Sequence, residues 1–384
     1  MPANSVIQIL PLGPQQGGHA ATTRQALALP PVGTDDNTAR VLAPIADALG
    51  RPLRDLRISV TDRCNFRCGY CMPREVYGPG HRFMPQTALL SFEEIERASR
   101  LFLQLGVRKL RLTGGEPLMR KGLPELIARL AALRTLDGHA PEIALTTNGA
   151  LLAPRVAALK AAGLQRITIS LDALDDATFR RMSDSDVPVR QVLEGIDAAL
   201  QAGLAPIKVN MVVQKGVNDD QIVPMASHFR HTGVELRFIE YMDVGHTNGW
   251  RMDQVLPSGQ VQARLQEHFD LRAVAPAHAS DTARRVQHAD GGGVLGFISS
   301  VTEAFCASCN RLRLSTDGRL YTCLFASTGH DLRSALREGD SDEQILSRLQ
   351  SLWRVRSDQY SALRGHAKLP SAPSERIEMS YIGG

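Results

Sequence analysis

Six cysteines are the residues of this chain whose type and spacing most directly suggest chemistry, and they fall into two groups of three. The first group is Cys64-x3-Cys68-x2-Cys71 and the second is Cys306-x2-Cys309-x13-Cys323. Three thiolates can hold a cube of four irons in which one iron keeps an open position for another molecule. The spacing therefore favours two iron–sulfur clusters that each bind an external ligand.

Two other uses of the cysteines stay open. A disulfide framework allows fifteen pairings of six cysteines, but such frameworks belong mainly to small secreted chains. A structural zinc site needs four ligands, so each group would require a further residue such as a histidine. Most of the 11 histidines follow no pattern, and His228 and His231 are predicted to lie on the surface of a helix.

The composition is that of an ordinary globular protein. Of the 384 residues 43% are hydrophobic, and 44 Lys and Arg against 40 Asp and Glu leave a net charge of +4. This length allows two or three domains, and so weak a positive charge argues against nucleic-acid binding. No apolar run approaches the roughly 18 residues of a membrane span, and no targeting signal is apparent. We therefore expect a cytoplasmic protein that binds neither nucleic acid nor a membrane.

Three regions are predicted along the chain. Residues 1–44 are expected to be a flexible extension, because residues 1–38 hold five prolines, four glycines and only three charges without an apolar period. A short helix is expected around residues 39–49. Residues 45–244 are expected to form an α/β domain, and residues 245–384 a C-terminal α+β region that carries the second cysteine group.

Strand-like segments alternate with helical segments over the α/β region. The strands are predicted at 56–60, 109–113, 142–147, 166–171, 207–213 and 234–240. This alternation implies a parallel sheet with right-handed crossovers. Because six units are two fewer than the eight of a closed barrel, the predicted fold is a partial (βα)6 barrel of the TIM type.

Apolar and polar residues alternate along these strands, whereas parallel strands usually form continuous apolar runs. Since side chains alternate across a strand, one set can pack on the helices while the other lines the barrel interior. The interior set is predicted to contain five cations and one clear carboxylate: Arg57, Lys109, Arg111, Lys208, Arg237 and Glu235. Unpaired buried cations are costly, so a polyanionic ligand is expected. A sheet with one solvated face is the alternative.

Residues that could take part in catalysis or binding follow the strand ends, where the active site of a parallel barrel lies. The first cysteine group follows the first strand, Gly114-Gly115-Glu116-Pro117 follows the second, and the motif Thr147-Asn148-Gly149 ends the third. In the C-terminal region, Asp317-Gly318 predicts a two-residue hairpin turn that pairs Thr316 with Arg319. This pairing would bring Cys323 back toward Cys309.

These motifs resemble the radical S-adenosylmethionine (SAM) superfamily, chiefly through Cys64-x3-Cys68-x-Tyr70-Cys71 and the Gly-Gly-Glu-Pro run. Within it, several segments resemble the GTP 3′,8-cyclase family, which carries out the first step of molybdenum cofactor biosynthesis. They are DLRISVTDRCNFRCGYCMP (55–73), LRLTGGEPLMR (110–120), LTTNG (145–149), SLDALD (170–175), RFIEYMDVG (237–245), FCASCNRLRLSTDGRLYTCLFA (305–326) and SYIGG (380–384).

The resemblance implies roles for particular residues. Each cysteine group would hold a [4Fe–4S] cluster, the first binding SAM and the second the guanine of GTP. Four residues would contact SAM: Tyr70, Gly115, Ser170 and Met242. The GTP contacts would be Arg57, Arg111, Thr146, Lys208, Arg311 and Arg313, with Lys109 and Arg237 as weaker candidates. The terminal Gly383 and Gly384 would reach into the active site.

The resemblance also implies a reaction and partners. A 5′-deoxyadenosyl radical from SAM would abstract the ribose 3′ hydrogen of GTP, and the new radical would attack C8 of the guanine. The implied partners are an electron donor such as a flavodoxin or ferredoxin, the downstream cyclic pyranopterin monophosphate synthase, and a second copy of the chain in a homodimer. Two alternatives stay open: a zinc-bearing nucleic-acid module, and another radical SAM enzyme with an auxiliary cluster, such as a peptide modifier.

Overall fold

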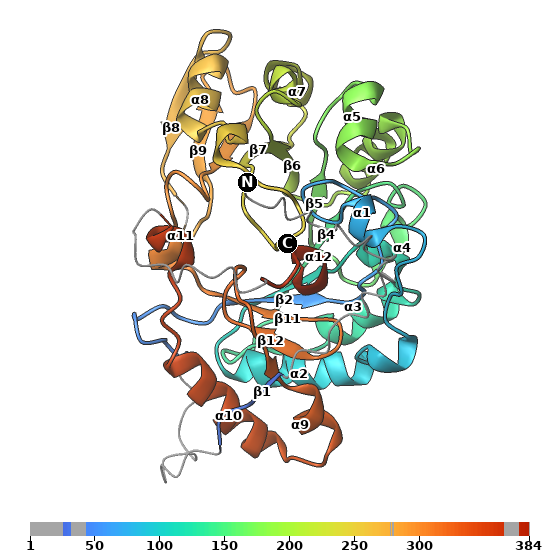
Figure 1. Ribbon diagram of the computed structural model, residues 1–384, viewed down its shortest axis with the longest axis vertical. Helices are drawn as coiled ribbons and strands as arrows, with labels where there is room; N and C mark the ends of the chain where they lie inside the picture. The colour runs from blue at the N-terminus through green and yellow to red at the C-terminus, as the bar shows by residue number, and fades with distance from the viewer. Residues whose placement is uncertain (1–25, 32–43, 277, 279, 365–375, 384) are drawn as a thin grey trace, which may run out of the picture.

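The computed structural model describes residues 26–31, 44–276, 278, 280–364 and 376–383 (Figure 1). Most of the predicted extension, residues 1–25 and 32–43, lies outside these ranges, as does Gly384. Of the helix expected around residues 39–49, only residues 44–49 are described, and they are not helical. Ala46 instead forms an isolated bridge with Pro52.

Six parallel strands form the centre of one sheet, in the order of the chain. They are β2 (Asp55–Ser59), β3 (Lys109–Thr113), β4 (Glu142–Thr147), β5 (Arg166–Ser170), β6 (Ile207–Val213) and β7 (Glu235–Glu240). The crossovers contain α2 (Phe92–Gln104), α3 (Leu123–Ala131), α4 (Val156–Ala161), α5 (Asp176–Ser183), α6 (Val189–Gln201) and α7 (Ile222–Phe229). The partial (βα)6 barrel predicted from the sequence is confirmed.

The C-terminal region extends both edges of this sheet, which the sequence did not predict. On one side β10 (Val294–Ile298) pairs in parallel with β7, followed by the antiparallel β9 (Arg284–His288) and β8 (Leu271–Val274). On the other side β11 (Arg311–Leu314) pairs in parallel with β2, followed by β12 (Arg319–Tyr321) and β13 (His330–Asp331). The outermost strand there, β1 (Leu27–Ala28), comes from the predicted N-terminal extension, so a part of that extension joins the sheet. Residues that follow the barrel in sequence therefore flank it on both sides.

The remaining helices lie around this sheet. They are α1 (Arg74–Tyr77), α8 (Ser258–Gln266), α9 (Arg333–Arg337), α10 (Asp342–Arg354), α11 (Tyr360–Leu363) and α12 (Met379–Ile382). Single 3-10 turns span Gln86–Ala88, Pro117–Met119, Asp219–Gln221, Met252–Gln254 and Cys306–Ser308. In Figure 1, α10 lies at the lower edge near α2, whereas α12 lies near the centre of the molecule. Within the described ranges no helix is long and apolar enough to cross a membrane.

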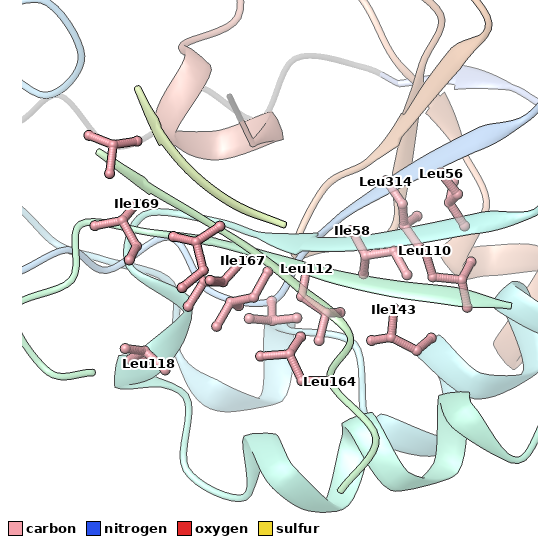
Figure 2. Packing of buried hydrophobic residues seen from close by; sticks show 14 of the residues in the cluster. Leu56, Ile58, Leu110, Leu112, Leu118, Ile143, Leu164, Ile167, Ile169 and Leu314 are labelled. Atoms are coloured by element: carbon pink, nitrogen blue, oxygen red, sulfur yellow. The ribbon is translucent and has the colours of Figure 1, made fainter. Parts of the chain in front are cut away.

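The apolar set of strand residues packs against the helices, as the alternation predicts. Leu56, Ile58, Leu110 and Leu112 are completely buried, and Figure 2 shows them beside Ile143, Ile167 and Ile169 in one continuous core. Burial of such side chains contributes about 1.5–3 kcal/mol each. Because successive residues of a strand face opposite sides, this core fixes the polar set toward the other face.

The predicted register of the 311–324 hairpin is wrong by one residue. Arg313 pairs with Tyr321 and Leu314 with Leu320, and the Ser315 N–H donates to the Arg319 carbonyl at 2.8 Å. Thr316, Asp317 and Gly318 therefore form a three-residue loop in which Gly318 has a φ of +87°. The Ser315 hydroxyl bonds to the Asp317 carboxylate and accepts from the Arg319 N–H, which stabilises the longer loop.

Candidate active site

The carboxyl ends of the barrel strands open onto a cavity of about 970 Å³. Its lining includes all six cysteines, which are free thiols, although the two groups are more than 230 residues apart in the chain (306 − 71 = 235). It also includes every SAM and GTP contact named above within the barrel and the hairpin: Tyr70, Gly115, Ser170, Met242, Arg57, Lys109, Arg111, Thr146, Lys208, Arg237, Arg311 and Arg313. This volume lies near the upper end of ligand cavities and is sufficient for more than one ligand.

The first cysteine group lies in the loop after β2, and backbone hydrogen bonds give that loop its shape. The Cys71 and Met72 N–H groups both donate to the Cys68 carbonyl, at 2.9 and 2.8 Å. The Phe66 N–H points at the Cys64 sulfur at 3.4 Å. Burial raises the pKa of Cys64 to about 11, and Glu116 adds to this effect. The three cysteines are half-buried at the cavity wall, and Cys64 lies close to a carboxyl group.

The Gly-Gly-Glu-Pro motif packs against the loop that carries the first cysteine group. A Cβ on Gly114 would lie 2.5 Å from the Thr61 carbonyl oxygen, and Gly114 has a φ of +143°. Only glycine allows the two loops to approach so closely. The fully buried Glu116 accepts hydrogen bonds from the Thr147 hydroxyl and the Asn148 N–H, both at 2.7 Å. The motif therefore joins the first cysteine loop to the ends of β3 and β4.

Tyr70 connects the first cysteine loop to the end of β5. Its hydroxyl donates to the Asp172 carboxylate at 2.8 Å, and the same carboxylate accepts from the Val212 N–H at 2.8 Å. Burial raises the pKa of Asp172 to about 6. Ser170 and Met242 line the cavity at the ends of β5 and β7. The four predicted SAM contacts thus come from three loops and the last residue of β5, which border one space.

The second cysteine group has a different electrostatic environment. Burial by itself would raise the pKa of Cys309, but the nearby Arg311 and Arg356 guanidinium groups lower it to about 6. The Arg311 guanidinium also lies over the Phe305 ring, 5.0 Å from its centroid. The first group therefore lies near carboxylates, whereas the second lies near cations.

A row of guanidinium groups crosses the cavity on three neighbouring strands. In the sheet register Arg57 on β2 lies directly between Arg313 on β11 and Arg111 on β3. Burial, followed by the charge of Arg313, lowers the pKa of Arg57 well below its usual value. The Nε atoms of Arg57 and Arg111 are buried and have no hydrogen-bond partner in the described part of the chain. Such a row is suited to a ligand with several negative charges.

Not all five predicted interior cations are unpaired, and this part of the prediction is corrected. Lys109 forms an ion pair with Glu142 at 3.0 Å, and Arg237 with Glu235 at 2.6 Å. Asp55 and Glu142 line the cavity beside the cations, so Glu235 is not the only interior carboxylate. The sequence pattern missed them because both stand at the first position of their strands. Arg57, Arg111 and Lys208 remain the stronger candidates for an anion.

The C-terminal segment enters the site. Arg313 donates from Nη1 to the Gly383 carbonyl, Ile382 is completely buried, and Met379 and Ser380 line the cavity. Gly383 has a φ of +75°, and a Cβ there would overlap the Thr113 hydroxyl. Gly384 lies outside the described residues. The approach of Gly383 to β3 and Arg313 agrees with a tail that reaches the substrate space.

Two contacts with cysteine sulfur atoms were not predicted from the sequence. Asn148 donates to the Asn65 side chain at 2.8 Å and lies 3.8 Å from the Cys64 sulfur. Arg356, a single arginine after α10, donates to the Cys309 sulfur at 3.4 Å. Asn148 belongs to the predicted Thr147-Asn148-Gly149 motif, although its contact with Cys64 was not predicted. Arg356 has no motif-like spacing to the cysteines, and only the packing of α10 brings it to the site.

The donor sets fit iron–sulfur clusters. Each group supplies three thiols to one cavity, and N–H donors of Phe66 and Arg356 point at sulfur atoms, as is typical around such clusters. No three His, Cys, Asp or Glu side chains in the described ranges are gathered around a single point suited to one metal ion.

A partial (βα)6 barrel with a Cys-x3-Cys-x2-Cys loop after its first strand defines a radical SAM protein. Residues 58–229 match the family model of the radical SAM superfamily, whose members use SAM and an iron–sulfur cluster. The fold is similar to that of the crystal structure of Streptococcus suis SuiB bound to S-adenosylmethionine, with a TM-score of 0.53 at 13% identity over 82% of this chain and 68% of the other.

Comparison of the rest of the chain identifies the family within the radical SAM superfamily. Residues 234–362 match the family model described as Molybdenum Cofactor Synthesis C. The chain is 48% identical over 363 residues to the GTP 3′,8-cyclase of Acidothermus cellulolyticus, covering 89% of this chain and 99% of that protein. It is 50% identical over 342 residues to that of Xanthomonas axonopodis pv. citri, covering 89% and 99%. The chain belongs to the GTP 3′,8-cyclase family.

Proposed function

We propose that this protein converts GTP to (8S)-3′,8-cyclo-7,8-dihydroguanosine 5′-triphosphate, the first step of molybdenum cofactor biosynthesis. One observation carries the proposal: thiols from two distant stretches of the chain line a single cavity together with a row of guanidinium groups. This arrangement supports two thiolate-bound clusters and a polyanion in one cavity. Its relatives are named for the same conversion.

The proposal includes two [4Fe–4S] clusters, one on Cys64, Cys68 and Cys71 and one on Cys306, Cys309 and Cys323. When bound, the first cluster and SAM would supply the radical that removes the ribose 3′ hydrogen, and the second cluster would hold the guanine. Residues 45–244 would form the SAM-binding barrel, residues 245–384 would carry the second cluster and the Gly383-Gly384 tail, and residues 1–44 would be an extension.

The remaining residues of the site would bind and orient the two small molecules. Tyr70, Gly115, Ser170 and Met242 would surround SAM. Forked contacts from Arg57, Arg111 and Arg313 would hold the triphosphate, with Lys208, Arg311 and Thr146 beside them. A reactive carbon must meet its target before water or another group does, so the tail and the cavity walls would exclude solvent and fix the ribose.

Anaerobic turnover tests this function. The reduced protein is incubated with SAM and GTP, and the products are searched for a cyclised nucleotide. Its formation together with 5′-deoxyadenosine supports the proposal. Formation of 5′-deoxyadenosine without consumption of GTP would favour the alternative of another radical SAM enzyme, such as a peptide modifier, since the fold alone does not separate the two.

Iron and sulfide analysis tests the number of clusters. Protein purified without oxygen is expected to hold about eight irons and eight sulfides per chain, and Cys323→Ala about four of each. The matched control Ser327→Ala, in the same loop, should keep about eight. Zinc without sulfide in the parent protein would instead support the nucleic-acid module.

The proposed partners follow from the reaction. The first cluster needs a one-electron donor, for which a flavodoxin or ferredoxin is suited, and the product would be consumed by the downstream cyclic pyranopterin monophosphate synthase. We place the protein in the cytoplasm, because thiolate-held clusters require a reducing compartment, and we propose a homodimer on the basis of the family resemblance.

Lys208 gives the proposed GTP binding a pH signature. Burial, followed by the charge of Arg237, lowers the pKa of Lys208 to about 7, so at about pH 8.5 the ligand-free side chain is mostly neutral. A bound triphosphate favours the charged form and raises this pKa, so binding should take up close to one proton. Uptake should vanish near pH 5, where Lys208 is already charged.

Calorimetry in two buffers of different ionisation enthalpy measures this uptake. It should disappear in Lys208→Met and persist in the control Lys160→Met, whose side chain is exposed and bonds to the Gly203 carbonyl. Equal uptake in Lys208→Met and the parent protein would show that another group takes up the proton.

A further inference from the structure

Arg356 contacts the two chain segments that carry the second cysteine group, one at Cys309 and the other next to Cys323. Its Nη1 donates to the Cys309 carbonyl at 2.9 Å and its Nη2 to the Cys309 sulfur at 3.4 Å. Its Nε donates at 3.1 Å to the carbonyl of Thr322, the residue before Cys323. One guanidinium thus joins the Cys306–Cys309 turn to the segment that carries Cys323, although 13 residues separate Cys309 from Cys323 in sequence.

The guanidinium is itself held in place by buried side chains, since the Nη1 atom that donates to the Cys309 carbonyl also donates to the Asp47 carboxylate. The Asp47 carboxylate pairs with Arg356 at 2.9 Å and with Arg51 at 2.6 Å, and the side chains of Asp47, Arg51 and Arg356 are at most 2% exposed. Arg51 in turn donates to the Cys306 carbonyl at 2.9 Å. The Trp353 ring lies against the Arg356 guanidinium, 4.6 Å from its centroid. The group therefore has little freedom to leave the cysteines.

The surrounding charge is positive overall. Asp47 faces two arginines, and the charge of Arg311 also acts on Cys309. Asp358 is the other carboxylate that pairs with Arg356 in the described part of the chain, at 3.3 Å, and its side chain is 34% exposed. A cationic group that donates to a ligand sulfur stabilises the more negative, reduced form of a cluster and makes the cluster easier to reduce.

We propose that Arg356 is a positioning residue for the second cluster. It holds the two cysteine-bearing segments together by donating to the backbone carbonyls of Cys309 and Thr322, and its charge raises the reduction potential of the cluster. The proposal rests on the proposed function only in that it requires the second cluster. Asp47 and Trp353 hold Arg356 in the geometry that both effects need. The first cysteine group has no corresponding cation bonded to sulfur in the described residues, so the two clusters differ in potential.

Two backgrounds isolate the clusters for the test. In the Cys64→Ala, Cys68→Ala, Cys71→Ala background only the second cluster assembles, and in the Cys306→Ala, Cys309→Ala, Cys323→Ala background only the first. Iron loss to a chelator and the midpoint potential are measured in both. The variants are Arg356→Met, which removes the charge, and Arg356→Lys, which keeps the charge but has its donors on one nitrogen atom and so cannot span the contacts made by Nε, Nη1 and Nη2. Arg354→Met, at the exposed end of α10, is the matched control.

For the second cluster, Arg356→Met is expected to speed iron loss about 10- to 100-fold and to move the midpoint potential to more negative values. Arg356→Lys should also speed iron loss but keep a potential near that of the parent. The first cluster should be unaffected by either change. Equal behaviour of Arg356→Met and Arg354→Met would overturn the proposal, as would equal acceleration for the first cluster, which indicates a general loss of folding.

The same experiment distinguishes a failure of the proposed function from a failure of the role proposed for Arg356. If the background that keeps Cys306, Cys309 and Cys323 binds no iron–sulfur cluster at all, the second cluster does not exist and both proposals fall. If this cluster forms and is indifferent to Arg356, only the role of Arg356 is refuted.

Discussion

Arg57→Met is expected to weaken GTP binding by about 10- to 150-fold while raising the melting temperature of the ligand-free protein. The loss follows from one charge-assisted contact to phosphate, worth about 1.5–3 kcal/mol. The gain in stability follows from the row on β11, β2 and β3, where Arg57 lies between Arg313 and Arg111 and its buried Nε has no hydrogen-bond partner among the described residues. Removing the central charge relieves repulsion that the bound triphosphate otherwise neutralises.

Titration calorimetry and thermal unfolding check both effects. Arg190→Met is the matched control, because it removes an equal charge from an exposed helix position where Arg190 pairs with Glu194. The control should change neither GTP affinity nor melting temperature noticeably, since such surface pairs contribute little. A fall in the melting temperature of ligand-free Arg57→Met would mean that this guanidinium stabilises the fold and is not reserved for an anion.

Gly383→Ala is expected to lower turnover by about 100-fold, a loss typical of a misplaced substrate or catalytic group. Two obstacles combine at this position: a φ of +75°, which favours glycine, and overlap of the new Cβ with the Thr113 hydroxyl. The segment must shift, and its carbonyl then leaves Arg313. Deleting Gly383 and Gly384 should have at least the same effect.

Gly339→Ala is the control that separates the effect of backbone strain from the effect of displacing the C-terminal segment. Gly339 has a similar φ of +92°, but nothing lies within 4 Å of an added Cβ. It should lose about 1 kcal/mol of stability and keep full turnover. Normal turnover in Gly383→Ala, or in the deletion of both glycines, would mean that the terminal residues are a tail without a role in the reaction.

The barrel was predictable because its signals are local. The alternation of Leu56, Ile58, Leu110 and Leu112 with polar neighbours places one set in the core and the other in the cavity, and the motifs at the strand ends converge because parallel strands end at one edge. The cysteine groups share a cavity for a less local reason: β11 pairs with β2, and this pairing has no sequence signal.

The predictions that were wrong or incomplete depended on contacts between residues that the sequence pattern does not link. The hairpin was placed one residue out of register because Asp317-Gly318 suggests a two-residue turn, whereas the Ser315 side chain supports a three-residue loop. The ion pairs of Lys109 and Arg237 were missed because pairing depends on neighbouring strands. Arg356 was missed because a single arginine after α10 reaches Cys309 only through tertiary packing.

Transfer of a hydrogen isotope tests most directly whether SAM and GTP meet in one chamber. The reduced protein is given SAM and GTP that carries deuterium at the ribose 3′ carbon, and the 5′-deoxyadenosine produced is analysed by mass spectrometry. We expect one deuterium in 5′-deoxyadenosine and an equal amount of cyclised nucleotide. Unlabelled 5′-deoxyadenosine, formed while the deuterated GTP stays intact, would contradict a shared site for the two molecules.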